Sequence, residues 1–394
     1  MRILQLHNHH ASLGGAMEVL AHEGSILAAA GHDVEQYTLP AAETLGLPAW
    51  RAGAKAVWNV EAARDVSSRI AAFKPDVVHV HTPFPLLSPS VFRAAYAAGV
   101  PAVTTLHSYR YSCVVGTCVR DGRICEDCVG SKLKLPGIRH ACYHDSRAAT
   151  TALTLGLGIH RAAGTFHKAV TRYLTLTDFA RRLMVRDGYP AERIFVKPNS
   201  VPDPGVEGRR EGGPREFFFA GRLIKIKGVL TLLEAWRDVP PGVKLVIAGD
   251  GELRPIVEAA AAKDSSIEFL GWVDEETVTN RMRDAEVVLV PSEWYEGQPL
   301  VMLRSLAVGT PLLTSDLENI CEDVMAAGCA WTFETGNVGS LRDRLTELIE
   351  HPELAADLRK RCRDTYVESY SPAADLIRLE RTYDEVCAEV ARGA

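Results

Sequence analysis

The stretch PSEWYEGQPLVMLRSLAVGTPLL, residues 291–313, decides the fold, because a loop, a helix and a strand are expected there in direct succession. The apolar run 285–290 before it is expected to be a buried strand, and residues 300–307 a short amphipathic helix that stops at Gly309. A second apolar strand is expected at once, over 311–314. This alternation predicts an α/β protein with a parallel sheet.

The loop of this stretch contains Glu296 and Gly297 and is expected at the carboxyl edge of the sheet, where open α/β sheets bind ligands. Backbone N–H groups that open the following helix can hold an anionic group. The loop therefore predicts a polar-ligand site with one carboxylate and an anion-binding helix start. An ordinary strand–loop–helix unit without a ligand explains the same residues equally well.

The length of 394 residues predicts two domains. The α/β pattern stops at the Pro-rich run KPNSVPDP and resumes after a Gly-rich run. We expect a first domain over 1–198, a linker over 199–214, a second domain over 215–370 and a C-terminal helix over 371–394.

The composition, with 47% hydrophobic and 24% charged residues, is typical of a soluble globular protein. The sequence shows no signal peptide, and its longest apolar stretch, 148–158, is too short and too polar to span a bilayer. We therefore expect a cytoplasmic protein.

Charge is distributed unevenly between the two halves. Basic residues outnumber acidic ones up to residue 203, acidic residues outnumber basic ones after it, and 12 of the 13 histidines lie in the first half. A basic first domain favours an anionic substrate or a membrane surface. Unselected variation of the surface is the alternative.

The first domain opens with a βαβ pattern, in which a strand over 2–7 is followed by Gly14-Gly15 and a helix over 17–30. A glycine turn lets the backbone approach a ligand closely and places N–H groups at a helix start. The spacing is not the G-x-G-x-x-G of dinucleotide-binding proteins, which argues against an oxidoreductase.

A histidine follows another strand of this domain. His107 comes directly after the apolar run 102–106, so it is expected at the ligand edge of the sheet. His79 and His81 lie within a preceding strand and are expected to be core residues or to support the site from behind.

Residues 108–147 do not follow the α/β pattern, and they contain five of the nine cysteines. Cys125 and Cys128 form a C-x-x-C pair, and four thiolates with such a pair suit a tetrahedral structural zinc site. The expected ligands are Cys113, Cys125, Cys128 and Cys142, with Cys118 as the competing fourth. Reduced, buried thiols are a second interpretation. A zinc-ribbon nucleic-acid module is a third, although the segment lacks the interleaved aromatic and basic residues of such modules.

The loop GRLIKIKG, residues 221–228, carries cations between a strand and a helix start. Arg222 and Lys227 lie five residues apart there, and two fixed cations with free helix N–H groups suit a diphosphate. A solvated basic loop is the alternative. Because Glu296 is expected at the same edge of the same sheet, the diphosphate site is the better interpretation.

Together these motifs resemble the retaining glycosyltransferases of family 4, which have the GT-B architecture. The resemblance covers the whole chain, in the GG loop, the strand-tip His107, the KPNSVPD linker, the GRLIKIKG loop, the AGDGE turn and the EGQPLVML…GTP segment. Each motif alone is weak, and the combination is specific. The region HSYRYSC…CEDC…CY is similar to that of a bacterial subset of the family, and this similarity favours Cys142 over Cys118 as the fourth ligand.

The resemblance implies a GT-B fold, with two Rossmann-like domains that face each other across a cleft and a C-terminal helix that crosses back to the first domain. The second domain would bind a nucleoside-diphosphate sugar of UDP or GDP type, and the first would bind the acceptor. Catalysis would depend on charge and position, with the departing phosphate helping to deprotonate the acceptor on the same face of the sugar. No catalytic metal is implied, so any zinc would be structural.

The resemblance also implies a role for each motif. Arg222 and Lys227 would stabilise the diphosphate leaving group, together with N–H groups of the Gly14-Gly15 turn. His107 would contact the donor sugar, and Glu296 would accept hydrogen bonds from sugar hydroxyls. The helix start, whose N–H groups would contact sugar and phosphate, comprises Gly297, Gln298, Pro299 and Leu300.

One position departs from the family pattern. A second glutamate, which binds the ribose, is expected eight residues after Glu296, but this chain has Arg304 there. A carboxylate accepts hydrogen bonds from two ribose hydroxyls, whereas a guanidinium only donates them. Arg304 is expected to bind an anionic or unusual donor group, to pair with Glu293 or Glu318, or to mark a weakly active member of the family.

The sequence therefore predicts a retaining glycosyltransferase of the hexosyltransferase type. Its acceptor is expected to be a small molecule, as in natural-product biosynthesis of secondary metabolites, or a cell-envelope intermediate. A non-catalytic binding protein with the same fold is the alternative that Arg304 suggests. No nucleic-acid partner is expected, whereas peripheral contact with the inner membrane face and a monomeric or homodimeric state are compatible with the sequence.

Overall fold

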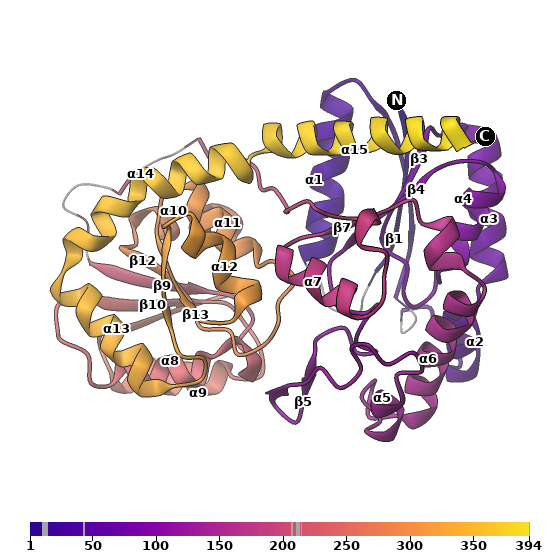
Figure 1. The fold of residues 1–394 in the computed structure, drawn as a ribbon. Coiled ribbons are helices and arrows are strands. Elements are labelled where there is room, and N and C mark those ends of the chain that lie inside the picture. The colour runs from indigo at the N-terminus through magenta and orange to yellow at the C-terminus, as the bar shows by residue number, and fades with distance from the viewer. Residues whose placement is uncertain (10–14, 42–43, 206–207, 210–212, 214, 394) are drawn as a thin grey trace. The chain divides into compact units, whose positions relative to one another are not determined.

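The computed structural model describes residues 1–9, 15–41, 44–205, 208–209, 213 and 215–393. The chain divides into two compact units, one of residues Met1–Asn199 with Asp375–Ala394 and one of residues Ser200–Ala374. Each unit has helices around one parallel sheet (Figure 1), so the predicted α/β fold with two parallel sheets is confirmed.

The sheet of the first unit has the strand order β2-β1-β3-β4-β7-β8. Its strands are β1 (Arg2–Asn8), β2 (Asp33–Leu39), β3 (Val77–Thr82), β4 (Ala102–Leu106), β7 (Arg172–Thr175) and β8 (Ile194–Val196). Its helical segments are α1 (Gly15–Ala29), α2 (Ala49–Val57), α3 (Val60–Phe73), α4 (Ser90–Ala97), α5 (Leu135–Arg139), α6 (Arg147–Ala162), η1 (Thr165–Ala169), α7 (Asp178–Arg186), η2 (Ala191–Arg193) and most of α15 (Pro372–Gly393). Ile3 packs in one apolar cluster and Leu4 in another, because successive residues of a strand that is buried on both faces point to opposite sides.

The last helix, α15, completes the core of the first unit, although it follows the second unit in sequence. Leu379, Tyr383 and Val386 of this helix are buried against a cluster that contains Ile3 of β1 and Val103 of β4. Figure 1 shows the helix, in yellow, lying along this unit.

The second unit has a sheet with the strand order β11-β10-β9-β12-β13-β14. Its strands are β9 (Glu216–Ala220), β10 (Lys244–Ala248), β11 (Ile267–Gly271), β12 (Val287–Val290), β13 (Leu312–Ser315) and β14 (Ala330–Phe333). Its helical segments are η3 (Lys225–Lys227), α8 (Val229–Trp236), α9 (Arg254–Lys263), α10 (Glu275–Asp284), α11 (Leu300–Ala307), α12 (Glu318–Ala326), α13 (Val338–Glu350) and α14 (Pro352–Ser369). Phe217 packs with α8 and α13, whereas Phe218 packs with α11 and α14, so both faces of the sheet are covered.

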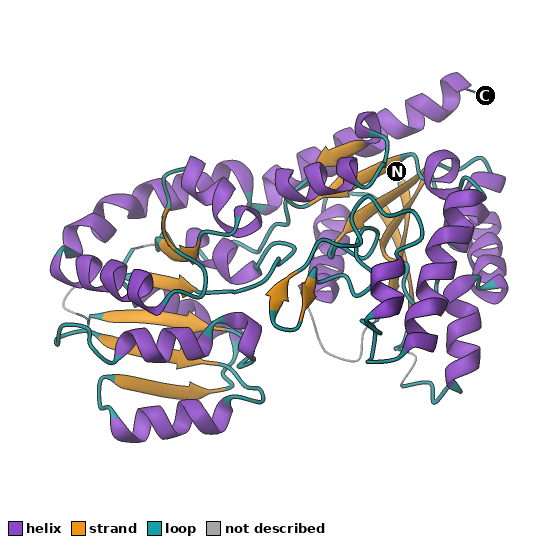
Figure 2. Cartoon of the chain, turned by 60° about the horizontal axis from the view of Figure 1, so that its bottom comes forward, coloured by secondary structure: helices purple, strands orange, loops and turns teal. Residues whose placement is uncertain are grey.

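The structure differs from the sequence-based expectation mainly in the first unit. Helices α2 and α4 were not predicted from the sequence, since each is short and begins directly after a proline. The cysteine-rich segment 108–147 contains a small antiparallel hairpin, β5 (Val119–Arg120) with β6 (Arg123–Ile124), besides α5. Figure 2 shows that loops make up much of this segment. Within the described residues, no helix has the length and apolar character that crossing a membrane requires.

Candidate functional site

Glu296 lies in the loop between β12 and α11, and only 7% of its surface is exposed. Lys227 Nζ donates to its Oε2 at 2.5 Å, and Ser292 Oγ donates to its Oε1. Asn319 Nδ2, from the first turn of α12, donates to the Glu296 backbone carbonyl at 2.8 Å. Lys227 and Ser292 therefore hold the carboxylate, and Asn319 holds the backbone of the same residue, at the carboxyl edge of the sheet.

The loop 221–228 presents its two predicted cations differently. Arg222 is exposed, and within the described part of the chain it has no ion-pair partner. Lys227 ends the short helix η3, is 17% exposed at its side chain, and is bonded to Glu296. The structure thus brings together Lys227 and Glu296, two of the predicted site residues that lie far apart in sequence.

Glycines let the loops of this edge pack backbone against backbone. Gly228 has φ +71°, and a Cβ atom there would lie 1.8 Å from the Pro291 carbonyl oxygen. A Cβ on Gly249 would lie 1.9 Å from the Gly221 carbonyl oxygen. Only glycine fits such approaches, which explains Gly228 of the GRLIKIKG motif and Gly249 of the AGDGE motif and fixes the position of Lys227 relative to Glu296.

The start of α11 matches the predicted anion-binding feature. The helix spans Leu300–Ala307, as expected, and Pro299 precedes it without a side-chain cap among the described residues. The N–H groups of its first turn therefore lack the usual side-chain acceptor. Gly297 and Gln298 connect this helix start to Glu296.

Arg304 lies on α11 and is paired with a residue that the sequence did not suggest. Its Nη2 contacts Glu275 Oε1, at the start of α10, at 3.2 Å. Both line a cavity of about 460 Å³ in the second unit. Glu293, one of the two partners suggested for Arg304, accepts a hydrogen bond from Thr231 Oγ1.

The predicted residues of the first unit lie at the carboxyl ends of β1 and β4. His107 directly follows β4, is partly buried, and its Nε2 lies 3.1 Å from His81 Nδ1. Gly15 begins α1 and is exposed. Gly14 lies outside the described residues.

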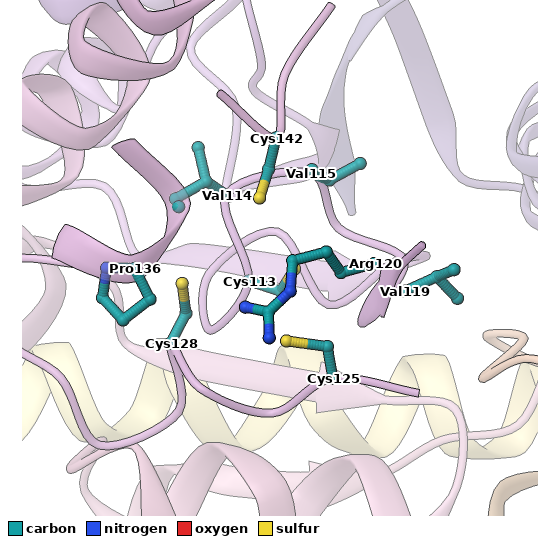
Figure 3. Close-up of a pocket in the computed structure, with 10 residues that line it drawn as sticks. Cys113, Val114, Val115, Val119, Arg120, Cys125, Cys128, Pro136 and Cys142 are labelled. Atoms are coloured by element: carbon teal, nitrogen blue, oxygen red, sulfur yellow. The ribbon is translucent and has the colours of Figure 1, made fainter. Parts of the chain in front are cut away.

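The cysteine-rich segment gathers four thiols around one small space. Cys113, Cys125, Cys128 and Cys142 line a cavity of about 20 Å³, and Cys118 is not among its lining residues. Figure 3 shows the four sulfur atoms turned toward the same region, with the guanidinium of Arg120 beside them. A hydrogen bond from the Cys118 thiol holds the pKa of Cys113 down at about 5. Burial raises the pKa of Cys128 to about 11.

The sequence analysis missed the side chains that hold Glu296 in place. Ser292 lies two residues after β12, and Asn319 lies in the helix that follows β13, at the same edge of the sheet. The rule that ligands bind at the carboxyl ends of parallel strands would have included both.

Two protein-family models divide the chain between them. Residues 11–200 match the model described as "Glycosyl transferase 4-like domain", and residues 206–365 match "Glycosyl transferases group 1". The phosphatidyl-myo-inositol mannosyltransferase of Mycolicibacterium smegmatis is 26% identical over 96% of this chain and 89% of its own length. That of Mycobacterium tuberculosis (strain H37Rv) is 30% identical over 45% of this chain and 48% of its own length.

Solved structures with the same fold include a sucrose-phosphate synthase and a protein in complex with UDP. Sucrose-phosphate synthase from Thermosynechococcus elongatus superimposes with a TM-score of 0.70 over 99% of this chain and 100% of that chain, at 14% identity. Anabaena HepE in complex with UDP superimposes with a TM-score of 0.68 over 98% of this chain and 100% of that chain, also at 14% identity. With the two family matches in tandem and this fold, the chain belongs to the family 4 glycosyltransferases of GT-B architecture.

Proposed function

We propose that this glycosyltransferase retains the configuration of the sugar that it transfers from a nucleoside diphosphate to a hydroxyl acceptor. The observation that carries the proposal is the group of side chains around Glu296 in the second unit. It combines a buried carboxylate, the ammonium of Lys227 and the uncapped start of α11. A sugar diphosphate needs these three groups, namely an acceptor for hydroxyls, a cation and N–H donors for phosphate. The complexes of HepE with UDP and with UDP-glucose support this type of donor.

Arg222 and Lys227 stabilise the leaving diphosphate in this proposal. When the bond between the anomeric carbon and the phosphate oxygen breaks, negative charge grows on that oxygen, and fixed cations lower the barrier. An ammonium has three N–H donors, so Lys227 can bind phosphate while it keeps Glu296. The leaving phosphate oxygen takes the proton of the acceptor hydroxyl, which attacks the same face. The proposal needs no catalytic metal.

The nucleoside of the donor is assigned to the cavity between α10 and α11. Arg304 holds Glu275 at its rim, and a carboxylate oxygen of Glu275 can accept hydrogen bonds from the ribose. Glu275 thus replaces the carboxylate that the family pattern places at position 304. Glu275→Gln is expected to weaken binding of a nucleoside diphosphate about tenfold, the factor for one charge-assisted hydrogen bond. Glu276→Gln, the neighbouring carboxylate on the same cavity, is the control.

The first unit is assigned to the acceptor, and His107 and the turn at Gly15 to the donor's sugar and phosphates. The relatives named phosphatidyl-myo-inositol mannosyltransferases favour a lipid-linked, cell-envelope acceptor at the inner face of the membrane. Labelled sugar that partitions into organic solvent after incubation with membrane lipids would support this class. Label that stays in the aqueous phase with a small acceptor would support a small-molecule acceptor instead.

Nucleotide binding gives the first test of the whole proposal. Thermal unfolding in the presence of UDP, GDP, ADP and CMP is expected to show stabilisation by at least one diphosphate. The best nucleotide then defines a panel of nucleotide sugars, and slow release of the diphosphate indicates a working catalytic site. Failure of every nucleotide at millimolar concentration would contradict the proposal.

A non-catalytic binding protein is the second candidate, because Arg304 stands where the family pattern has a glutamate. It would bind a nucleoside diphosphate and its sugar derivative without releasing the sugar over long incubation. The donor panel therefore separates the two candidates.

The four cysteines around the small cavity are assigned to a structural zinc ion. Cavity size and donor type fit, since the space is large enough for one small atom and four thiolates are a common zinc ligand set. The sulfur atoms must move closer together, because among the described residues only Glu23, His79 and His81 have their ligand atoms within 4.8 Å of one another. Arg120, whose guanidinium also bonds Asp127, would offset the negative charge of four thiolates around a divalent ion.

Metal analysis of the reduced, purified protein tests this assignment. About one equivalent of zinc is expected, and Cys128→Ser should lose it, whereas Cys321→Ser in the second unit should keep it. Less than half an equivalent in the wild type, prepared without chelators, would reject the site.

A further inference from the structure

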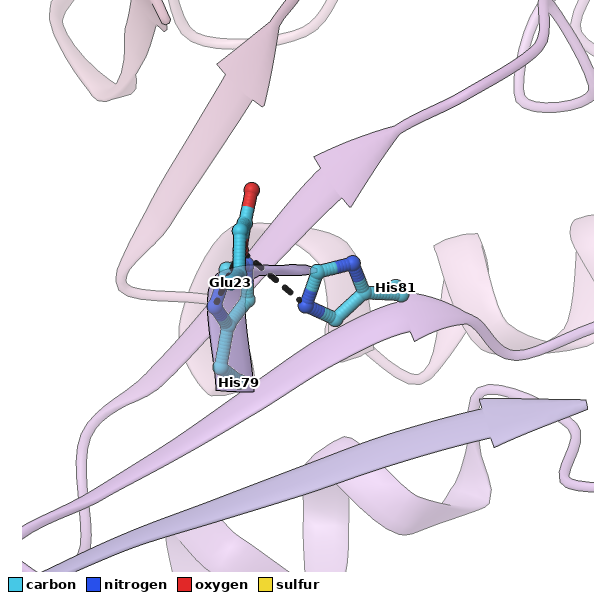
Figure 4. Close-up of side chains that lie close together, drawn as sticks. All are labelled: Glu23, His79 and His81. Atoms are coloured by element: carbon cyan, nitrogen blue, oxygen red, sulfur yellow. Dashed lines mark ion pairs between the residues drawn. The ribbon is translucent and has the colours of Figure 1, made fainter. Parts of the chain in front are cut away.

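Next to His107, the first unit contains a buried set of ionisable side chains to which the proposed function gives no role. Glu23 lies on α1, and His79 and His81 lie on β3, each with no more than 1% of its surface exposed. Figure 4 shows the carboxylate of Glu23 facing both imidazole rings.

The contacts of this set argue against a bound metal ion. Both ring nitrogens of His79 are already hydrogen-bonded to hydroxyls, Nδ1 to Tyr383 and Nε2 to Thr105, each at 2.8 Å. Glu23 Oε1 accepts a hydrogen bond from the ammonium of Lys197, which would repel a cation. His79 and Glu23 Oε1 are therefore occupied by hydrogen bonds of their own.

Through His81, this buried set reaches His107. Glu23 Oε2 and His81 Nε2 lie 3.4 Å apart and form no hydrogen bond with any described residue, so a small adjustment of either side chain would pair them. His81 Nδ1 lies 3.1 Å from His107 Nε2. The ring planes of His81 and His107 are nearly parallel, with centroids 5.3 Å apart and an angle of 14° between the planes, as an in-plane hydrogen bond between ring nitrogens requires. Each neutral imidazole carries one N–H, so the proton positions along this row depend on one another.

Glu23 is the member of the row that titrates near neutral pH. Burial raises its pKa to about 7, and Lys197 must also neutralise Asp375, whose Oδ1 lies 2.9 Å from Nζ. Burial holds the pKa of His81 well below its usual value, so this ring stays neutral. The titratable and charged groups around the row come from β1, α1, β3, the ends of β4 and β8, and α15, namely His7, His22, His79, His107, Lys197, Asp375 and Tyr383.

The two states of Glu23 impose opposite proton positions on neutral His107. When Glu23 pairs with His81, an ionised Glu23 only accepts, so His81 carries its proton on Nε2 and its Nδ1 accepts from His107 Nε2. His107 Nδ1 is then an acceptor. A protonated Glu23 donates to His81 Nε2, His81 carries its proton on Nδ1 and donates to His107 Nε2, and His107 Nδ1 becomes a donor.

We propose that Glu23 and His81 are positioning residues that set the tautomer of His107, and thereby whether this ring accepts a hydrogen bond from the donor sugar or donates one to it. The proposal rests on the proposed contact between His107 and the sugar. Positive charge develops on the sugar as the leaving group departs, and a hydroxyl that donates to an acceptor nitrogen stabilises this charge better than one that accepts. The state with ionised Glu23 is therefore the more active one.

Glu23→Gln separates the two states without changing the size of the side chain. Lys197 requires an acceptor, so the amide oxygen of Gln faces Lys197 and the NH2 group faces His81. The variant imitates protonated Glu23 at every pH. Glu380→Gln is the matched control, because Glu380 of α15 also contacts a histidine, His32 at 2.9 Å, but lies outside the row.

Nitrogen-15 NMR of labelled histidines is the first measurement, and it needs no substrate. The His107 signal, assigned by its loss in His107→Asn, should change from the Nδ1–H to the Nε2–H tautomer with a midpoint near pH 7 in the wild type and in Glu380→Gln. It should remain Nδ1–H in Glu23→Gln. A single His107 tautomer across this range in the wild type, or a wild-type change in folded Glu23→Gln, overturns the proposal.

The pH profile of kcat is the second measurement. The wild-type kcat should rise about tenfold through pH 7, a factor suited to one hydrogen bond that changes from unfavourable to favourable, and Glu23→Gln should stay flat at the lower level. A rise that persists in folded Glu23→Gln overturns the proposal. If the tautomer changes as described but no donor turns over, the proposed function fails while the link between Glu23 and His107 stands.

Discussion

Replacing Lys227 with methionine is expected to lower kcat/KM about 10²- to 10³-fold. Methionine keeps the aliphatic stem and removes only the ammonium, which lies 2.5 Å from Glu296 Oε2. The Lys227 side chain is 17% exposed, so solvent screens its charge only in part. Loss of one preorganised donor to a developing anion costs about 2.7–4 kcal/mol of transition-state stabilisation, which gives this range.

The same substitution also has a cost in the absence of substrate. Glu296 would lose its charged partner and keep Ser292, so the free energy of unfolding should fall by about 1.5–3 kcal/mol, as for a lost hydrogen bond to a charged group. Denaturant unfolding measures this quantity, and donor hydrolysis with single-turnover analysis measures the chemical step. Because the two costs arise in different states, each is determined separately.

Lys225 supplies the control, since it is an exposed lysine in the same short helix. Lys225→Met should change neither rate nor stability by more than about 0.5 kcal/mol. A Lys227→Met enzyme that retains its rate within about a factor of two would show that the ammonium does not act on the leaving group, because even 1 kcal/mol exceeds that factor.

Three further outcomes follow from the packing. Gly228→Ala should destabilise the protein by about 3 kcal/mol or more in urea unfolding, because a Cβ would meet a backbone oxygen at 1.8 Å. Gly242→Ala is the control, since Gly242 has φ +100° and open space around it. This variant should show only the backbone strain of about 1–2 kcal/mol. Burial raises the pKa of Glu23 to about 7 from an unfolded value of 4.5, so the folded state favours the protonated carboxyl. The contribution of this carboxyl to the free energy of unfolding is therefore lost as the pH rises from 4.5 to about 7. The difference in unfolding free energy between wild type and Glu23→Gln should change by up to about 3 kcal/mol across it, and a constant difference would refute the shift. Asp187→Asn should lower the free energy of unfolding by about 3–5 kcal/mol, because it leaves buried Lys134, 2.5 Å away, without its charged partner. A decrease of less than about 1 kcal/mol would contradict this expectation.

Features that depend on neighbours in sequence could be predicted from the sequence. Helix α11 was predicted at its observed bounds, because its apolar spacing and the glycine that follows it are local signals. The grouping of the four cysteines follows from the C-x-x-C pair and from chain reversals within one short segment. The approach of Lys227 to Glu296 was expected from the rule that parallel strands share one ligand edge.

Features that depend on tertiary neighbours could not be predicted. Nothing in the sequence distinguishes Glu23 from a surface residue of an amphipathic helix, because its partner Lys197 lies 174 residues away, in a run that indicated the end of the first domain and gave no signal for this pair. The contact of Arg304 with Glu275 depends on how α10 is rotated against α11, and the sequence, which suggested Glu293 or Glu318, gave no signal for it.

The buried position of α15 in the first unit has a consequence for biosynthesis. Tyr383 fills the core beside β1 and β3, and Asp375 bonds Lys197, yet both residues leave the ribosome after all of the second unit. The first unit therefore cannot finish folding as it emerges, although most of its chain is made first. A nascent chain arrested before residue 375 should keep an apolar strip of its first sheet open to chaperones, and supplying 372–393 as a separate peptide should close it.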